Sequence, residues 1–186
     1  MLESADTVAR SRLRSGEHLL WAGRPDPRRL FNASDFFLIP FGLFFLGFSI
    51  FWTVGASRGA PGVFGLVGYL FIVIGAYYVV GRFVVKRYRL SHSTYAVTDI
   101  RAFALVGTKL IETPIASERT TTSSGDSHVT VLWNSSNSPF SFSRGQVPVN
   151  SGLDGILSPL PMAFFDVPEP AALLAALDRA SARTPN

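Results

Sequence analysis

The apolar run from Phe36 to Val85 constrains the fold of this chain more than any other feature. It is interrupted once, by a segment rich in glycine, and so divides into two stretches at 36–54 and 63–81. Neither stretch contains a charged residue. Each is close to the roughly 20 apolar residues that a helix needs to cross a hydrocarbon core of about 30 Å. We predict two membrane-spanning helices joined by a tight outer turn, within a transmembrane hairpin over 36–85.

Two long helices buried in a soluble core are the alternative interpretation of these stretches. A helix on the surface of a soluble core has one apolar stripe and one polar face. Here phenylalanine and other apolar residues occur on every side, and the polar residues of the first stretch are limited to Ser49 and Thr53. The sequence therefore favours a lipid environment over a soluble core.

Positive charges around the apolar run predict its orientation. The segment before it carries Arg24, Arg28 and Arg29, whereas the connection between its two stretches carries only Arg58. Four more basic residues follow the second stretch: Arg82, Lys86, Arg87 and Arg89. Cytoplasmic flanks of membrane helices carry the excess of Lys and Arg. We therefore expect a multi-pass protein of the cell membrane with both termini in the cytoplasm.

The basic residues after the second stretch are candidate contacts to the lipid bilayer. The chain has 17 basic and 13 acidic residues, a net charge of +4, and this excess equals the four residues of that cluster. A basic residue close to an anionic membrane surface contributes about 1 kcal/mol of attraction. We assign anionic headgroups to Arg82, Lys86, Arg87 and Arg89. Since no basic excess remains elsewhere, we expect no nucleic-acid partner.

Small residues seven positions apart mark candidate packing faces on the two helices. The first stretch has Gly42 and Ser49, and the second has Gly68 and Gly75. Seven residues make about two helical turns, so the members of each pair share one face. Small residues allow the backbones of membrane helices to approach closely. We predict that these four residues lie in a helix–helix contact.

The sequence shows no constellation of catalytic or metal-binding residues. The chain has no cysteine, which excludes disulfides and sites with Cys ligands. Its histidines, His18, His92 and His128, have no second histidine or carboxylate at the helical spacing of a metal pair. No phosphate-binding loop or nucleophile elbow occurs. We therefore expect neither an enzyme nor a cofactor or metal site.

The rest of the chain divides into three segments. Residues 1–14 form a polar N-terminal tail with a weak helical stripe, and 15–35 form a short strand and a linker leading to the membrane. In the segment 86–183, apolar residues alternate with polar ones over short runs, which predicts antiparallel strands. A long loop is expected at 144–161. A last strand at 163–167 precedes an amphipathic helix that begins near Pro170.

Four stretches in this order resemble a bacterial family of two-span membrane proteins with a PH-like domain. They are Gly16–Pro25 with the sequence GEHLLWAGRP, Val80–Phe83 at the end of the second span, Tyr95–Arg101 with YAVTDIR, and Phe164–Pro168 with FFDVP. The resemblance covers roughly residues 15–180. It implies an α+β membrane protein, with a small antiparallel PH-like β-barrel or curved sheet that is closed by the C-terminal helix and lies in the cytoplasm. The family implies no catalytic residues.

Two functions are compatible with these expectations. The first is a non-catalytic membrane protein whose PH-like domain binds or scaffolds a protein or anionic lipid at the cytoplasmic face. Its partner would be an unidentified protein or a second copy of the chain. The alternative is an accessory subunit of a membrane enzyme or transport complex. A site inside the hairpin would need an ionisable group within the membrane, and neither stretch has one away from its end.

Overall fold

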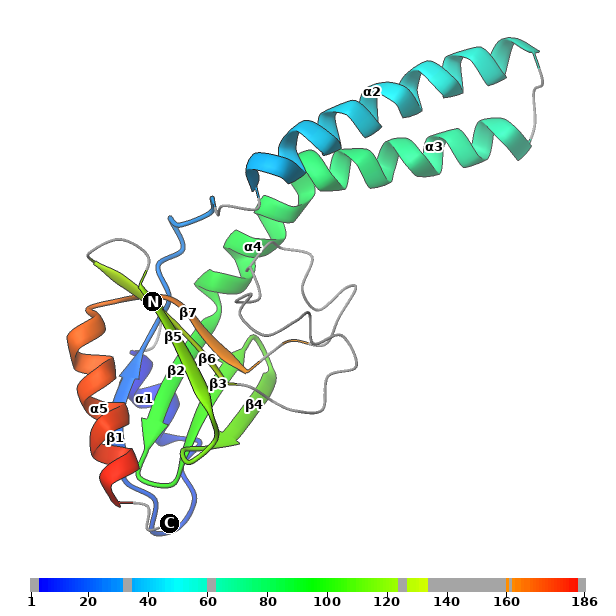
Figure 1. Ribbon diagram of the computed structural model, residues 1–186. Coiled ribbons are helices and arrows are strands. Elements are labelled where there is room, and N and C mark those ends of the chain that lie inside the picture. The colour runs from blue at the N-terminus through cyan, green and yellow to red at the C-terminus, as the bar shows by residue number, and fades with distance from the viewer. Residues whose placement is uncertain are drawn as a thin grey trace. The chain divides into compact units, whose positions relative to one another are not determined.

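The computed structural model describes residues 4–31, 35–59, 63–123, 127–133, 160 and 162–183, which fall into two compact units (Figure 1). One unit, Leu30–Lys86, is helical. The other contains the described residues up to Arg29 and from Arg87 onward, and it combines helices with two antiparallel sheets. The α+β class expected from the sequence is confirmed. We call the two units the hairpin and the β unit.

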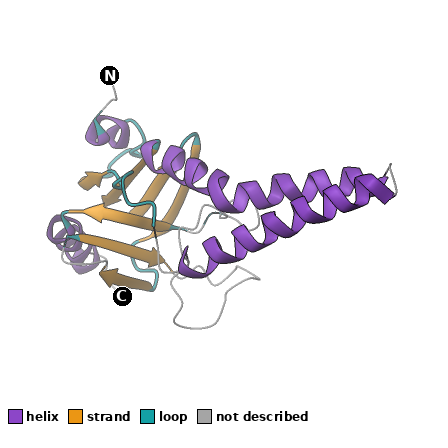
Figure 2. Ribbon diagram, turned by 90° about the horizontal axis from the view of Figure 1, so that it is seen from above, coloured by secondary structure: helices purple, strands orange, loops and turns teal. Residues whose placement is uncertain are grey.

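The hairpin consists of two helical segments that lie side by side (Figures 1 and 2). Helix α2 covers Asp35–Gly59 and helix α3 covers Val63–Ala76. Helix α2 is longer than the predicted 36–54 and includes Gly55–Gly59, which the sequence assigned to the connecting turn. Its extension contains Ala56 and Arg58, which favour helix.

The second helical segment continues beyond its predicted end at Gly81. After α3 comes one π-helical turn, η1, at Tyr77–Gly81, and then helix α4 at Arg82–Ser91. The sequence gives strand-like alternation only from Thr94 onward. The helix therefore persists through the basic cluster to Ser91, and strand β2 (Ser93–Thr98) follows it.

The β unit contains one sheet of four strands and one of three. The first sheet has the order β1 (Leu19–Gly23), β2 (Ser93–Thr98), β3 (Arg101–Val106) and β4 (Lys109–Pro114). The second has the order β5 (Arg119–Ser123), β6 (His128–Trp133) and β7 (Ala163–Pro168). All neighbouring strands are antiparallel, as the alternation predicted.

One hydrophobic core joins both sheets to the C-terminal helix α5, Pro170–Arg183. The ring of Phe164 stacks on Tyr95 with centroids 4.7 Å apart and meets Trp133 edge-on at 4.8 Å. The predicted apolar stripe of α5 is confirmed, because Leu173 and Leu177 are fully buried in this core. The helix thus covers apolar side chains that the sheets would otherwise expose.

A short helix, α1 (Ala5–Arg10), covers the other face of the first sheet. It buries Ala9 against Ala96 and Phe103, which alternate along their strands with the residues of the main core. The sequence predicts a polar tail here, but the hydroxyl of Ser4 accepts a hydrogen bond from the backbone N–H of Thr7 and caps the helix. The loop predicted at 144–161 lies outside the described residues, apart from Leu160.

Candidate functional site: the apolar hairpin and its charged base

The small residues predicted for helix packing lie where α2 meets the second helical segment. A Cβ atom placed on Gly68 would lie 2.2 Å from Oγ1 of Thr53, and one on Gly75 would lie 2.9 Å from the Cα atom of Leu46. Gly42 faces Tyr78 and Val79 in η1. The glycines therefore allow a backbone approach that any larger residue would block. This face serves the contact inside one chain.

The two hydroxyl side chains of α2 point into the hairpin and form hydrogen bonds there. Ser49 and Thr53 are 1% and 5% exposed. The Ser49 hydroxyl donates to the carbonyl of Phe45 at 2.7 Å, and the Thr53 hydroxyl donates to the carbonyl of Ser49 at 2.6 Å. Because both donors are satisfied within their own helix, the hairpin carries these polar groups without needing water.

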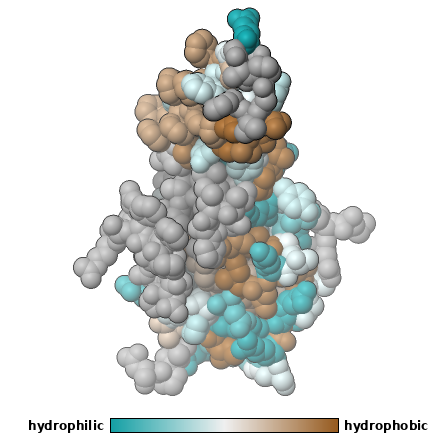
Figure 3. Space-filling view, turned by 90° about the vertical axis from the view of Figure 1, so that its right-hand side faces the viewer, coloured by the Kyte–Doolittle hydropathy of each residue, from teal (hydrophilic) through white to brown (hydrophobic). Residues whose placement is uncertain are grey.

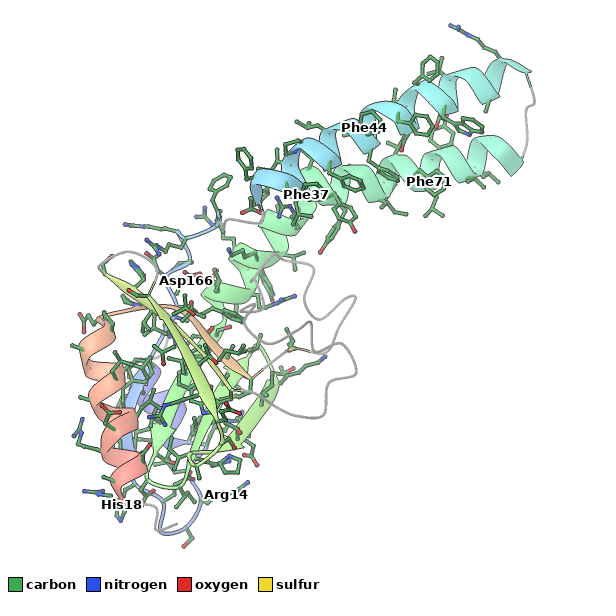
Figure 4. All side chains as sticks on the ribbon, viewed as in Figure 1. Arg14, His18, Phe37, Phe44, Phe71 and Asp166 are labelled. Atoms are coloured by element: carbon green, nitrogen blue, oxygen red, sulfur yellow. The ribbon has the colours of Figure 1, made fainter. Side chains whose placement is uncertain are left out.

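Many apolar side chains on the outer surface of the hairpin are exposed on both helices, and the face drawn in Figure 3 includes a hydrophobic area in brown. Phe36, Phe44 and Phe51 of α2 are 91%, 74% and 77% exposed, and Leu66 and Val73 of α3 are nearly as open. Figure 4 shows Phe37 and Phe44 on α2 and Phe71 on α3 among these side chains. Monomeric soluble proteins rarely expose apolar patches above a few hundred Å². By length and composition, both helical segments could cross a membrane.

A buried ion pair closes the base of the hairpin. The guanidinium of Arg82 pairs through Nη1 with the carboxylate of Asp35, and both residues are almost completely buried. The Nζ of Lys86 donates to the carbonyl of Leu30 at 2.9 Å. The ion pair therefore connects the start of α4 to the start of α2, and the Lys86 hydrogen bond connects α4 to the segment before α2.

The π-helical turn explains the position of Arg82. At the end of η1, the backbone N–H of Arg82 donates to the carbonyl of Tyr77, five residues earlier. The Nε of Arg82 donates to the carbonyl of Tyr78 at 2.7 Å. One side chain thus supplies a donor to a carbonyl in the π-helical turn and neutralises Asp35.

The four predicted headgroup contacts have different environments. Arg82 and Lys86 are 0% and 1% exposed, and their partners named above belong to the protein. Arg87 is exposed, whereas Arg89 is partly buried. Among the four, Arg87 is therefore the side chain most accessible to a headgroup.

The β unit contains a buried charge network that the sequence did not reveal. Glu17 accepts hydrogen bonds from Arg101 at 2.7 and 2.9 Å, from the Thr98 hydroxyl at 2.8 Å and from the Arg14 backbone N–H at 2.7 Å. Burial by itself raises the pKa of the Glu17 carboxyl, but these hydrogen bonds outweigh it and lower the pKa to about 2. Arg101 also pairs with Glu112. The network fixes the segment before β1 to the sheet.

A second group of polar residues lies at the opposite end of the β unit from Arg14 and His18 (Figure 4). Asp166 has φ +46° and is buried, and its carbonyl accepts a hydrogen bond from the Asp26 backbone N–H at 3.0 Å. The imidazole of His128 lies 3.3 Å from the carboxylate of Asp26. Within the described ranges, no three His, Asp or Glu residues are grouped to hold a metal ion.

Comparison with known proteins returns no matching family model, no matching curated protein and no matching solved structure. The case for a function therefore depends on the chemistry of the chain itself.

Proposed function

We propose that this chain is a non-catalytic integral membrane protein that displays a PH-like interaction unit at the cytoplasmic face, where the unit binds a protein or anionic lipid. The observation that carries the proposal is the hairpin, whose apolar side chains point outward while its hydroxyls point inward. Water would be a poor solvent for such a surface, and lipid is a good one.

The buried Asp35–Arg82 pair supports the same proposal. An isolated charge at the edge of a hydrocarbon layer is costly, and pairing within the protein reduces that cost. The pair occurs at the end of the hairpin that also carries Lys86, while Arg58 at the other end is the single charge near the connection. This asymmetry favours cytoplasmic termini under the positive-inside rule.

The architecture of the β unit supports the PH-like part of the proposal. Four- and three-stranded antiparallel sheets share one core, and the C-terminal helix covers that core. These features agree with the sheet and closing helix that the sequence resemblance implies. The buried Glu17–Arg101 network has a structural role, because it fixes the segment before β1 to the first sheet. This role is compatible with a binding function of the β unit.

Native mass spectrometry of the full chain, extracted gently from its own membrane, tests the binding role. We expect a stoichiometric protein partner, or retained anionic phospholipid that is reduced in Arg87→Gln. Arg179→Gln is the matched control, because Arg179 is an exposed arginine of α5. A lone chain that retains neither protein nor anionic lipid would contradict the proposed function.

A further inference from the structure

Among the described residues, four strands form the edges of the two sheets, and three of them carry features that block further pairing. Edge strands β1 and β7 each have a register irregularity, and β7 ends in Pro168. Edge strand β4 carries Lys109, Glu112 and Pro114. Charges, prolines and bulges of this kind prevent a sheet edge from pairing with another chain.

The fourth edge strand, β5, lacks these features over Thr120–Thr122. Its register with β6 is regular, with Thr121 opposite Val131. All three threonines are exposed. Threonine is β-branched and favours the extended conformation of a strand. This part of β5 is therefore a regular, uncharged strand with one side paired.

Among the described residues, the helix that contacts β5 does so at the start of the strand. Helix α5 contacts the first residue of the strand, where Arg119 donates to the Ser181 hydroxyl at 2.9 Å and lies 3.5 Å from the Asp178 carboxylate. In the part of the chain that the structure describes, the strand that pairs with Thr120–Thr122 is β6. The outer side of these residues can accept another strand.

We propose that β5 pairs antiparallel with β5 of a second copy of this chain, with the two-fold axis at Thr121. Such pairing joins two three-stranded sheets into one of six strands, and the interface is closed because both copies use the same surface. Thr121 lies opposite its own copy, and Thr120 lies opposite Thr122. Threonine pairs across strands are favourable, and no like charges meet in this register.

The second copy is favoured over a soluble partner because of the size of the contact. A strand of five residues offers far less than the roughly 1,200 Å² that a stable interface buries. Copies anchored in one membrane have a higher effective concentration than free partners. The inference therefore rests on the proposed membrane anchoring.

Single-cysteine crosslinking in native membranes tests this pairing, since the chain has no cysteine of its own. Directly opposed residues of an antiparallel pair have Cα atoms about 4.5–5.5 Å apart, which matches a disulfide. We expect Thr121→Cys to form a disulfide-linked dimer at least fivefold more than Thr120→Cys under mild oxidation. Leu110→Cys is the control for random collision, because Leu110 is an exposed residue of the edge strand β4.

Two further variants make the result specific to the register. Co-expressed Thr120→Cys and Thr122→Cys chains, carrying different tags, should form the mixed dimer. Adding Thr122→Lys to Thr121→Cys should suppress its crosslink, because two charges would then face the partner strand.

Equal crosslinking along the strand, no Thr121→Cys dimer, or a crosslink to another protein would overturn the inference. Alkaline extraction of the same membranes separates the two proposals. A chain that stays in the membrane but does not crosslink contradicts only the pairing, whereas a chain released by alkali contradicts the anchoring as well.

Discussion

Replacing Glu17 by glutamine should destabilise the β unit in a manner that depends on pH. The Glu17 side chain is fully buried and receives hydrogen bonds from Arg101, Thr98 and the Arg14 backbone. Although burial opposes ionisation, these bonds lower the pKa of the carboxyl from its ordinary value of 4.5 to about 2. The glutamine side chain keeps the shape but cannot carry the charge that Arg101 faces.

The sign and the size of the effect follow from the two pKa values. Because the pKa is lower in the folded state, the carboxylate stabilises the fold above pH 4.5 and loses this effect as the pH falls toward about 2. At about 1.4 kcal/mol per pH unit, the difference corresponds to about 3 kcal/mol at neutral pH. At pH 3 less than half of it should remain.

Urea unfolding of the full chain in detergent measures this effect by tryptophan fluorescence. Trp21 and Trp133 report on the core of the β unit, and Trp52→Phe removes the signal of the hairpin. Asp6→Asn is the control, because the Asp6–Arg10 pair is exposed to solvent and should contribute little to stability. A loss below about 0.5 kcal/mol for Glu17→Gln at pH 7, or an equal loss at pH 3, would show that the Glu17 charge does not stabilise the fold.

Three further predictions concern packing and the charged base. Gly68→Ile should weaken the hairpin in thermal unfolding in detergent, since its Cβ would overlap Thr53, whereas Gly55→Ile has open space and should not. Arg82→Gln should cost roughly 3–5 kcal/mol in the same assay by leaving Asp35 without that partner, and adding Asp35→Asn should recover part of the loss; an additive double variant would contradict this. Leu173→Ala should cost about 2–5 kcal/mol in urea unfolding, and Leu110→Ala, at an exposed position, should cost far less.

Local patterns in the sequence were sufficient to predict most helices and strands. The apolar stretches predicted α2 and α3, and alternation such as that of Val129, Val131 and Trp133 predicted β6, because each signal lies within one element. The stripe of Leu173 and Leu177 likewise indicated which face of α5 is buried.

The features that the sequence could not show depend on residues far apart in the chain. Glu17 and Arg101 are ordinary charges in sequence and become one network only when β1 pairs with β2. The π-helical turn at Tyr77–Gly81 has no local signal, and it brings Arg82 and Asp35 together. Consequently, two of the four predicted headgroup residues, Arg82 and Lys86, have partners inside the protein.

Labelling with a membrane-impermeant maleimide tests the central claim, that the hairpin spans a membrane with both termini in the cytoplasm. The cysteine-free chain allows two single-cysteine variants, Ala60→Cys in the segment between the helices and Ala182→Cys on the exposed side of α5. If the hairpin spans the membrane in this orientation, intact cells label Ala60→Cys, whereas Ala182→Cys reacts only after permeabilisation. Equal labelling of both variants in intact cells, or recovery of the chain in the soluble fraction, would contradict it.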